Sequence, residues 1–258
     1  SGGKALLSYF NPVTNIVTPS GQFILTGNTN VKFNGNGIGA DSIRLCLEDA
    51  SSTTVVNGII IPPYGIIDVS LTTGSVVLRS DLILFDENGN PQPTYDVLLL
   101  SNGNRVECGG GIKRGSPSGP SAKHGLVENP TTGTITDLDF PGSGLVPCKK
   151  LAEKDGYIYI AHNFLDEPGI GNIFMRKNIV SGVINSIPIF PIYPPYIRMS
   201  QVSDMIVTLE GMIVVVGSPL SFQASTTVIR FNPYNGVTES LSFDGIIFSN
   251  PDATSNIN

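Results

Sequence analysis

Short apolar stretches alternate with polar turn residues along the whole chain. Runs of four or five mainly apolar residues lie at 97–100, 157–161, 205–209, 212–216 and 228–231. Apolar runs of this length between turn residues are typical of buried β-strands. The pattern therefore predicts an all-β fold, with one stretch, 145–155, as the best candidate for a helix.

Tight turns are marked by dipeptides that end in glycine. They are Asn88-Gly89, Asn102-Gly103, Asp155-Gly156, Glu210-Gly211 and Asn235-Gly236. Asn-Gly and Asp-Gly supply the positive φ angles that two-residue hairpins need. Antiparallel hairpins are therefore expected throughout the chain.

One strand–turn–strand unit recurs five times. Its copies occupy 6–18, 66–78, 125–138, 173–187 and 228–241. Their turn residues, Asn15, Gly74, Gly133, Gly182 and Gly236, are 59, 59, 49 and 54 residues apart. This spacing indicates a repeat architecture.

A second hairpin unit precedes the first in the later copies. Residues 96–103 and 204–211 both begin with Asp and end with Gly, 149–156 has Lys in the first position, and 244–250 starts the frame again. Four strands in each repeat are typical of a β-propeller blade, whose faces are buried by neighbouring blades. We therefore predict a single β-propeller domain over 1–258, with about five four-stranded blades closed by both termini.

The turn of the first unit carries a family resemblance. Residues 9–17 (YFNPVTNIV), 128–135 (ENPTTGTI) and 230–238 (RFNPYNGVT) resemble the outer-strand turn of kelch-like propellers, in which an aromatic residue, Asp/Asn-Pro, Thr and Gly/Asn precede a strand. The resemblance implies a propeller fold. The stretch 21–65 lacks the second hairpin unit, which leaves an alternative: a β-sandwich over 1–93 and a smaller β domain over 94–258.

Composition and charge exclude some function classes. The formal net charge is −6, whereas a nucleic-acid-binding protein needs a basic surface. No apolar run reaches the roughly 18 residues of a membrane helix, so membrane insertion is not expected. The three cysteines, Cys46, Cys108 and Cys148, do not form a disulfide framework; they are three thiols, or one disulfide and a thiol.

No catalytic, metal or cofactor motif is assembled in the sequence. His124 and His162 are the only histidines, and no third ligand stands at zinc-like spacing. Residues 86–90 (DENGN) could supply oxygen ligands to calcium, but they lack the distal Glu of a calcium loop and fit a hairpin turn better. No cofactor or metal is therefore predicted.

Two sets of residues are candidates for a binding site. Asp96 and Asp204, with Asp41 and Asp244 as their relatives, would surround one mouth of a propeller channel, where five-bladed glycoside hydrolases place catalytic carboxylates. The alternative role for an Asp that precedes a strand is to cap the turn backbone. Proline-rich segments present the aromatic side chains of the second set, Tyr64, Tyr193 and Tyr196, which suit sugar stacking or protein contact.

These features favour a non-enzymatic recognition or structural module. It would bind a protein or a glycan through loops on one face, using the aromatic set together with Asp96 and Asp204. The low-charge, Gly- and Asn-rich composition also fits an extracellular or virion-surface component, and leaves oligomer formation open. The alternative function is a glycoside hydrolase or lyase that uses Asp96 and Asp204.

Overall fold

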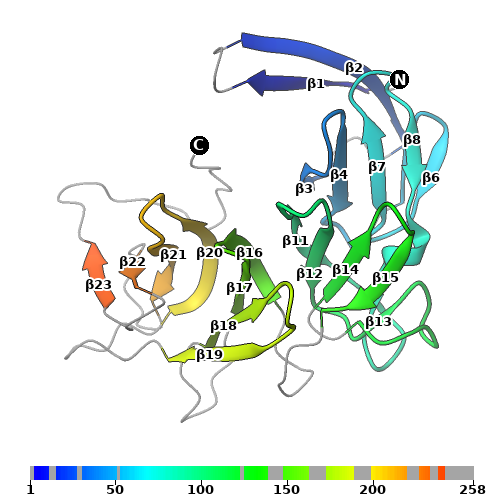
Figure 1. Ribbon diagram of the computed structural model, residues 1–258. Helices are drawn as coiled ribbons and strands as arrows, with labels where there is room; N and C mark the ends of the chain where they lie inside the picture. The colour runs from blue at the N-terminus through cyan, green and yellow to red at the C-terminus, as the bar shows by residue number, and fades with distance from the viewer. Residues whose placement is uncertain are drawn as a thin grey trace. The chain divides into compact units, whose positions relative to one another are not determined.

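The computed structural model describes residues 3–11, 16–27, 31–50, 53–122, 125–138, 148–162, 173–188, 199–219, 227–232 and 238–241. The chain divides into two compact units, Ser1–Asp139 and Phe140–Asn258 (Figure 1). All described sheets are antiparallel, and the only helical element among the described residues is one 3₁₀ turn, Ser80–Leu82. None of these residues belongs to a helix with the length and hydropathy of a membrane-spanning segment.

The first unit contains two four-stranded sheets whose strands pair in chain order, with short strands of other sheets inserted between their second and third strands. The first sheet is β3 (Phe33–Gly37), β4 (Ser42–Leu47), β7 (Ile66–Ser70) and β8 (Val76–Leu78). The second sheet is β11 (Thr94–Leu99), β12 (Arg105–Gly109), β14 (Gly125–Asn129) and β15 (Thr134–Asp137). A three-stranded sheet joins β9 (Leu84–Phe85) to β10 (Pro91–Gln92) and β13 (Lys113–Arg114).

The second unit repeats the four-stranded arrangement twice. The third sheet is β16 (Cys148–Lys154), β17 (Tyr157–His162), β18 (Ile173–Asn178) and β19 (Ile184–Pro188). The fourth sheet is β20 (Met199–Val207), β21 (Ile213–Pro219), β22 (Thr227–Phe231) and β23 (Thr238–Leu241). The stretch 145–155, which was the best candidate for a helix in a sequence without a convincing one, contains the strand β16 instead. Consecutive residues of β16 pair with β17, and this pairing overrides the weak helical preference of the segment.

The predicted outer hairpins are confirmed in all four of these sheets. The copies at 66–78, 125–138, 173–187 and 228–241 form the third and fourth strands of successive sheets. Gly74, Gly133 and Gly182 each have a φ of 70°, and their amides donate to the carbonyl four residues earlier. Glycine is needed at these turns because side chains rarely adopt this backbone conformation.

The N-terminal copy is used differently. Residues 6–18 lie in the hairpin of β1 (Gly3–Asn11) and β2 (Ile16–Gly27). Strand β2 then pairs with β5 (Thr54–Val56), which forms a hairpin with β6 (Ile59–Ile61). We call this four-stranded arrangement the N-terminal sheet. Its last two strands, β5 and β6, come from the connection between β4 and β7. The pairing of β2 with β5 joins two separate hairpins, so the sequence pattern within each hairpin did not predict it.

Both faces of the first sheet are buried within the first unit. One face joins the second sheet in a core that also contains residues near β9; its buried members are Ile38, Cys46, Ile66, Leu82, Leu84, Val97, Ala122 and Leu126. The other face packs against β5 and β6, in a core whose buried members are Leu47, Val56, Ile61, Ile67 and Val69. Burial on both faces explains why consecutive residues of these strands, such as Ile66 and Ile67, are both apolar and buried in different cores.

Candidate functional site

The first strands of the second, third and fourth sheets share a local irregularity near their starts. The pairing register shifts by one residue just before Asp96 in β11, Lys150 in β16 and Asp204 in β20. Such a shift is a β-bulge, which twists a strand and redirects its side chains. When the three hairpins are aligned on the glycine of their turns, Lys149 occupies the position equivalent to Asp96 and Asp204. In the structure the equivalent position is that of Lys150. The difference arises because only two residues separate the last paired residues of β16 and β17, whereas five separate those of β11 and β12.

Asp96 and Asp204 make the same backbone contact. Oδ1 of Asp96 accepts a hydrogen bond from the amide of Val97 at 3.1 Å, and Oδ1 of Asp204 accepts one from Met205 at 2.9 Å. In each case the carboxylate holds the amide that follows the bulge. These contacts match the capping role that sequence analysis weighed against a catalytic one.

Asp204 has a further partner in the second unit. Nζ of Lys150 lies 3.6 Å from Oδ1 of Asp204, which links the adjacent first strands β16 and β20. The two side chains are 26% and 35% exposed, so the pair contributes little to stability. Burial lowers the pKa of the preceding Lys149 to about 8. Asp96 belongs to the first unit.

Two tyrosines of the first unit lie close enough for one to affect the pKa of the other. Tyr64 lies in the connection between β4 and β7, with a φ of 54°, and its amide donates to the carbonyl of Asp49 at 3.2 Å. Tyr95 is the bulge residue before Asp96. Burial raises the pKa of Tyr95, and the proximity of Tyr64 raises it further. We call Tyr64 and Tyr95 the tyrosine pair. The proline-rich segment predicted Tyr64, whereas Tyr95 carried no signal except its position beside Asp96.

Gly110 packs closely against Gln92 and Tyr95. A Cβ atom at Gly110 would lie 3.4 Å from Oε1 of Gln92 and 3.7 Å from Cε2 of Tyr95. Gln92 is held in turn, because its Nε2 donates to Oδ2 of Asp86 at 3.1 Å. The Gln92 amide and the Tyr95 ring therefore lie close together beside Gly110.

The loop at 86–90 is a hairpin turn between β9 and β10, as expected. The Asp86 carboxylate accepts hydrogen bonds from the amides of Asn88 and Asn90 and from the Asn90 side chain. These bonds, those from Asn90 first, lower the pKa of Asp86. Within the described residues, no group of three His, Cys, Asp or Glu side chains is placed to hold a metal ion.

Asp41 occupies a different position from the other candidate aspartates. Asp41 lies in the β3–β4 turn, where its carbonyl accepts from the amide of Leu71 at 2.6 Å. It is therefore at the end of a first strand, and its expected equivalence to Asp96 is wrong. Tyr193, Tyr196 and Asp244 lie outside the described residues.

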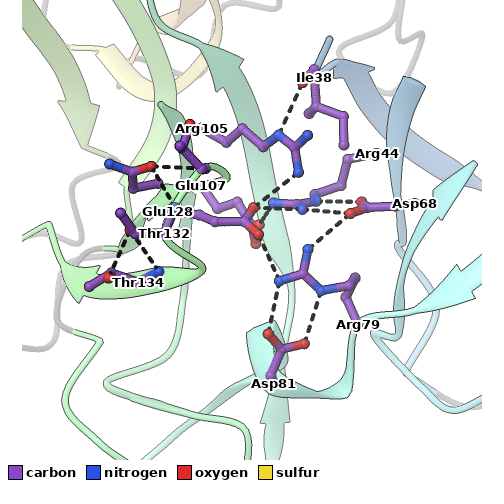
Figure 2. Close-up of polar contacts among 12 residues, drawn as sticks. Ile38, Arg44, Asp68, Arg79, Asp81, Arg105, Glu107, Glu128, Thr132 and Thr134 are labelled. Atoms are coloured by element: carbon purple, nitrogen blue, oxygen red, sulfur yellow. Dashed lines mark hydrogen bonds and ion pairs between the residues drawn. The ribbon is translucent and has the colours of Figure 1, made fainter. Parts of the chain in front are cut away.

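A buried ionic cluster, which sequence analysis missed, joins the first and second sheets (Figure 2). Arg44 of β4 has no exposed surface, and its guanidinium meets three carboxylates. Nε and Nη2 lie 2.6 and 2.7 Å from the Asp68 oxygens, Nη2 lies 2.8 Å from Glu128, and Nη1 donates to Glu107. The first partner is on β7 of the same sheet, while both glutamates belong to the second sheet.

Two more arginines extend the cluster. Arg79 contacts Asp68 at 3.0 Å, Glu128 at 2.9 Å and Asp81 at 2.8 Å. Nη1 of Arg105 lies 3.5 Å from Glu128, and its Nε donates to the carbonyl of Ile38 at 3.0 Å. We call these seven charged residues the ionic cluster: Arg44, Asp68, Arg79, Asp81, Arg105, Glu107 and Glu128.

Glu107 is the most enclosed carboxylate of the ionic cluster. The residue is 1% exposed, and burial raises its pKa to about 7 although Arg44 opposes the shift. Burial would also raise the pKa of Glu128, but there Arg44 and Arg79 outweigh it and lower the pKa. Because a substrate has no access to Glu107, the two glutamates do not form a catalytic pair.

The sequence signal of the ionic cluster is a charge inside an apolar strand. Arg44 lies in SIRLCL, Asp68 in IIDVS and Glu107 in RVECG. Each charge alone could face solvent on an edge strand. Only the stacking of two sheets shows that they share one buried layer.

The sequence of the chain matches no known protein family and no curated protein. Its fold is similar to solved β-propellers. A GH74 xyloglucanase from Xanthomonas campestris has a TM-score of 0.53 and 10% identity, over 94% of this chain and 37% of that protein. TolB from Acinetobacter baumannii has a TM-score of 0.49 and 10% identity, over 91% of this chain and 50% of TolB.

The chain thus spans only a part of each of these proteins. Identity at this level shows the fold and not the function, because propellers carry many unrelated functions. The chain has an all-β, propeller-like fold built from several antiparallel sheets.

Proposed function

We propose that the chain is a non-enzymatic recognition module that binds a protein or a glycan through the loops beside the first-strand starts. The observation that carries this proposal is the matching role of Asp96 and Asp204. Both carboxylates hold the amide that follows a bulge, and Asp204 also pairs with Lys150. A residue that serves the repeat in two sheets is a poor candidate for a catalytic residue, because an active site is asymmetric.

The tyrosine pair supports binding beside Asp96 in the first unit, because Tyr95 directly precedes Asp96. Tyrosine presents a rigid, amphipathic surface at low entropic cost, and a sugar ring or a protein side chain can stack on it. The φ of 54° at Tyr64 is uncommon for a side chain of this size and is a feature often found at binding sites. Tyr193 and Tyr196, which lie outside the described residues, are proposed as further aromatic contacts for the same kind of ligand.

We propose in addition that about five four-stranded sheets act as propeller blades of the kelch-like kind. Support comes from four consecutive four-stranded meanders and from the N-terminal sheet, which supplies a fifth. The fold similarity to the xyloglucanase, which extends over 94% of the chain, also supports this arrangement. Closure by both termini is tested by cryo-electron microscopy of the chain bound to a rigid antibody fragment, which would reveal or exclude a ring.

The function is tested by comparing binding with hydrolysis. Glycan-array and peptide-array binding would be measured for the wild-type chain, for D96N and D204N, and for Y64A, Y193A and Y196A. We expect binding to survive the two aspartate changes and to fall with at least one tyrosine change. The asparagine variants are suitable because an amide oxygen can still accept the backbone hydrogen bond.

The alternative function, a glycoside hydrolase or lyase, predicts the opposite result. Release of reducing sugar from a panel of polysaccharides would be measured for the same variants. If the wild-type chain cleaves a polysaccharide and either D96N or D204N abolishes the cleavage, the recognition proposal is wrong.

A further inference from the structure

The ionic cluster distributes its charges unevenly. It contains three arginines and four carboxylates, which leaves one negative charge in excess when all are ionised. Asp81 is 47% exposed and forms two hydrogen bonds with Arg79. The excess therefore falls on the carboxylates that lie between the sheets.

Glu107 has the weakest compensation among them. Within the described residues its only cationic contact is Arg44, and Arg44 also binds Asp68 through two nitrogens and Glu128 through one. One guanidinium charge is thus shared by three carboxylates. Asp68 and Glu128 each have a second arginine, Arg79, and Glu128 also has Arg105.

The two oxygens of Glu107 differ. Oε1 accepts the hydrogen bond from Arg44, whereas Oε2 is buried and meets no donor among the described residues. An ionised carboxylate with an unsatisfied buried oxygen is costly, and a group in this position binds a proton instead. Oε2 is therefore the atom that would carry the proton.

The other groups that face Glu107 reinforce this preference. Asp68 of β7 and Glu128 of β14 are negative neighbours, and Arg44 of β4 is the positive one. On the same layer lie the thiol of Cys46 on β4, whose pKa is raised by burial, and Asp96 on β11. The apolar neighbours Val97 and Leu126 pair with Glu107 in register, which keeps water away from it.

We propose that Glu107 is protonated when the first and second sheets are packed, and that its deprotonation loosens their contact. The ionic cluster is then a proton-dependent latch between two sheets. The chain would be most tightly packed in a mildly acidic medium and less so above neutral pH. This role is independent of the proposed recognition function.

The direction of the effect follows from the two protonation states. Below the unfolded-state pKa of a Glu, about 4.3, the stabilisation from the bound proton is fully present. It is lost as the pH rises through the folded-state value. Across this interval we expect the unfolding equilibrium constant to increase on the order of 100-fold.

The test is urea unfolding of the full chain at a series of pH values, for wild type, E107Q and E48Q. Glutamine reproduces the shape and hydrogen bonding of the protonated acid. We expect E107Q to remove the fall in stability between mildly acidic and slightly alkaline pH. Glu48, which forms an exposed pair with Lys32, provides the matched control, and E48Q should leave the fall unchanged.

A second measurement covers the case in which E107Q does not fold. Infrared difference spectra of the ¹³C-glutamate-labelled wild-type chain report the carbonyl stretch of a buried protonated acid directly. We expect this band at mildly acidic pH and its loss on passing above neutral pH. The absence of the band in the folded wild-type chain, or a pH dependence retained in E107Q, would overturn the proposal.

Discussion

Arg44 and Lys32 are basic residues of the same unit, and their surroundings give them different contributions to stability. Arg44 has no exposed surface and binds carboxylates on three other strands. Lys32 is 54% exposed and contacts Glu48 at 3.0 Å. Burial decides the difference, because a buried carboxylate that loses its cation has no water to replace it.

We therefore predict that R44M destabilises the chain by about 3 to 5 kcal/mol, because three carboxylates lose a shared partner. The matched change K32M should cost less than about 1 kcal/mol, since its pair is solvated. Urea unfolding followed by circular dichroism measures both. A similar loss for the two variants would show that the buried contacts of Arg44 do not stabilise the sheets.

The sequence predicted residues whose signal is local, and it did not predict those whose signal lies in packing. Asp96 and Asp204 occupy matching positions in two hairpins, and the structure gives them the same backbone contact. The link between Arg44 and Glu107 spans 63 residues and two sheets. The polar and apolar pattern within one strand does not predict which charged residues will contact each other between two packed sheets.

Among the strands, the bulge at the start of β11 depends on its aspartate. We predict that D96A costs about 1 kcal/mol, because the Val97 amide loses its side-chain acceptor. D96N keeps an acceptor and should stay within about 0.5 kcal/mol of wild type. Hydrogen exchange of the Val97 amide provides the local readout. Equal protection in D96A and wild type would contradict the capping role.

The start of β14 depends on a glycine. Gly125 has a φ of 143°, and an added Cβ would approach the Glu107 carbonyl oxygen to 2.0 Å. We predict that G125A destabilises the chain by about 2 to 3 kcal/mol through strain and this clash. G37A is the control, because nothing lies within 4 Å of an added Cβ, and it should be nearly neutral. Thermal unfolding of both variants distinguishes a strict steric demand from a general effect of removing glycine.

Hairpins were the elements that the sequence predicted best. Their turn residues are contiguous, and Asp155 and Gly156 both adopt the positive φ angles that the dipeptide suggests. The partner of the N-terminal hairpin was not predictable in this way. β2 pairs with β5, which is reached only after two strands of the first sheet.

For the whole molecule, the ionic cluster also sets a limit on stability at low pH. The pKa of Asp81 and that of Glu128 are lowered in the folded chain, since the arginines outweigh the effect of burial. Their stabilising contribution is present above the unfolded-state values and is lost as the pH falls through the folded-state values. Glu107 changes in the opposite sense.

We therefore predict that the free energy of unfolding passes through a maximum at mildly acidic pH. Urea midpoints between about pH 3 and pH 8 measure the curve. E128Q should weaken its acidic side and leave the decline toward alkaline pH in place. A free energy that rises steadily up to pH 8 would contradict this prediction.

The hairpin of β5 and β6, inserted between two strands of the first sheet, affects the order in which the chain can fold. It covers one face of that sheet, and the second sheet covers the other, so every layer of this stack comes from the first 139 residues. A nascent chain could complete these layers on the ribosome while the remainder is still being synthesised. The first unit would then be folded before most of the second unit has been synthesised.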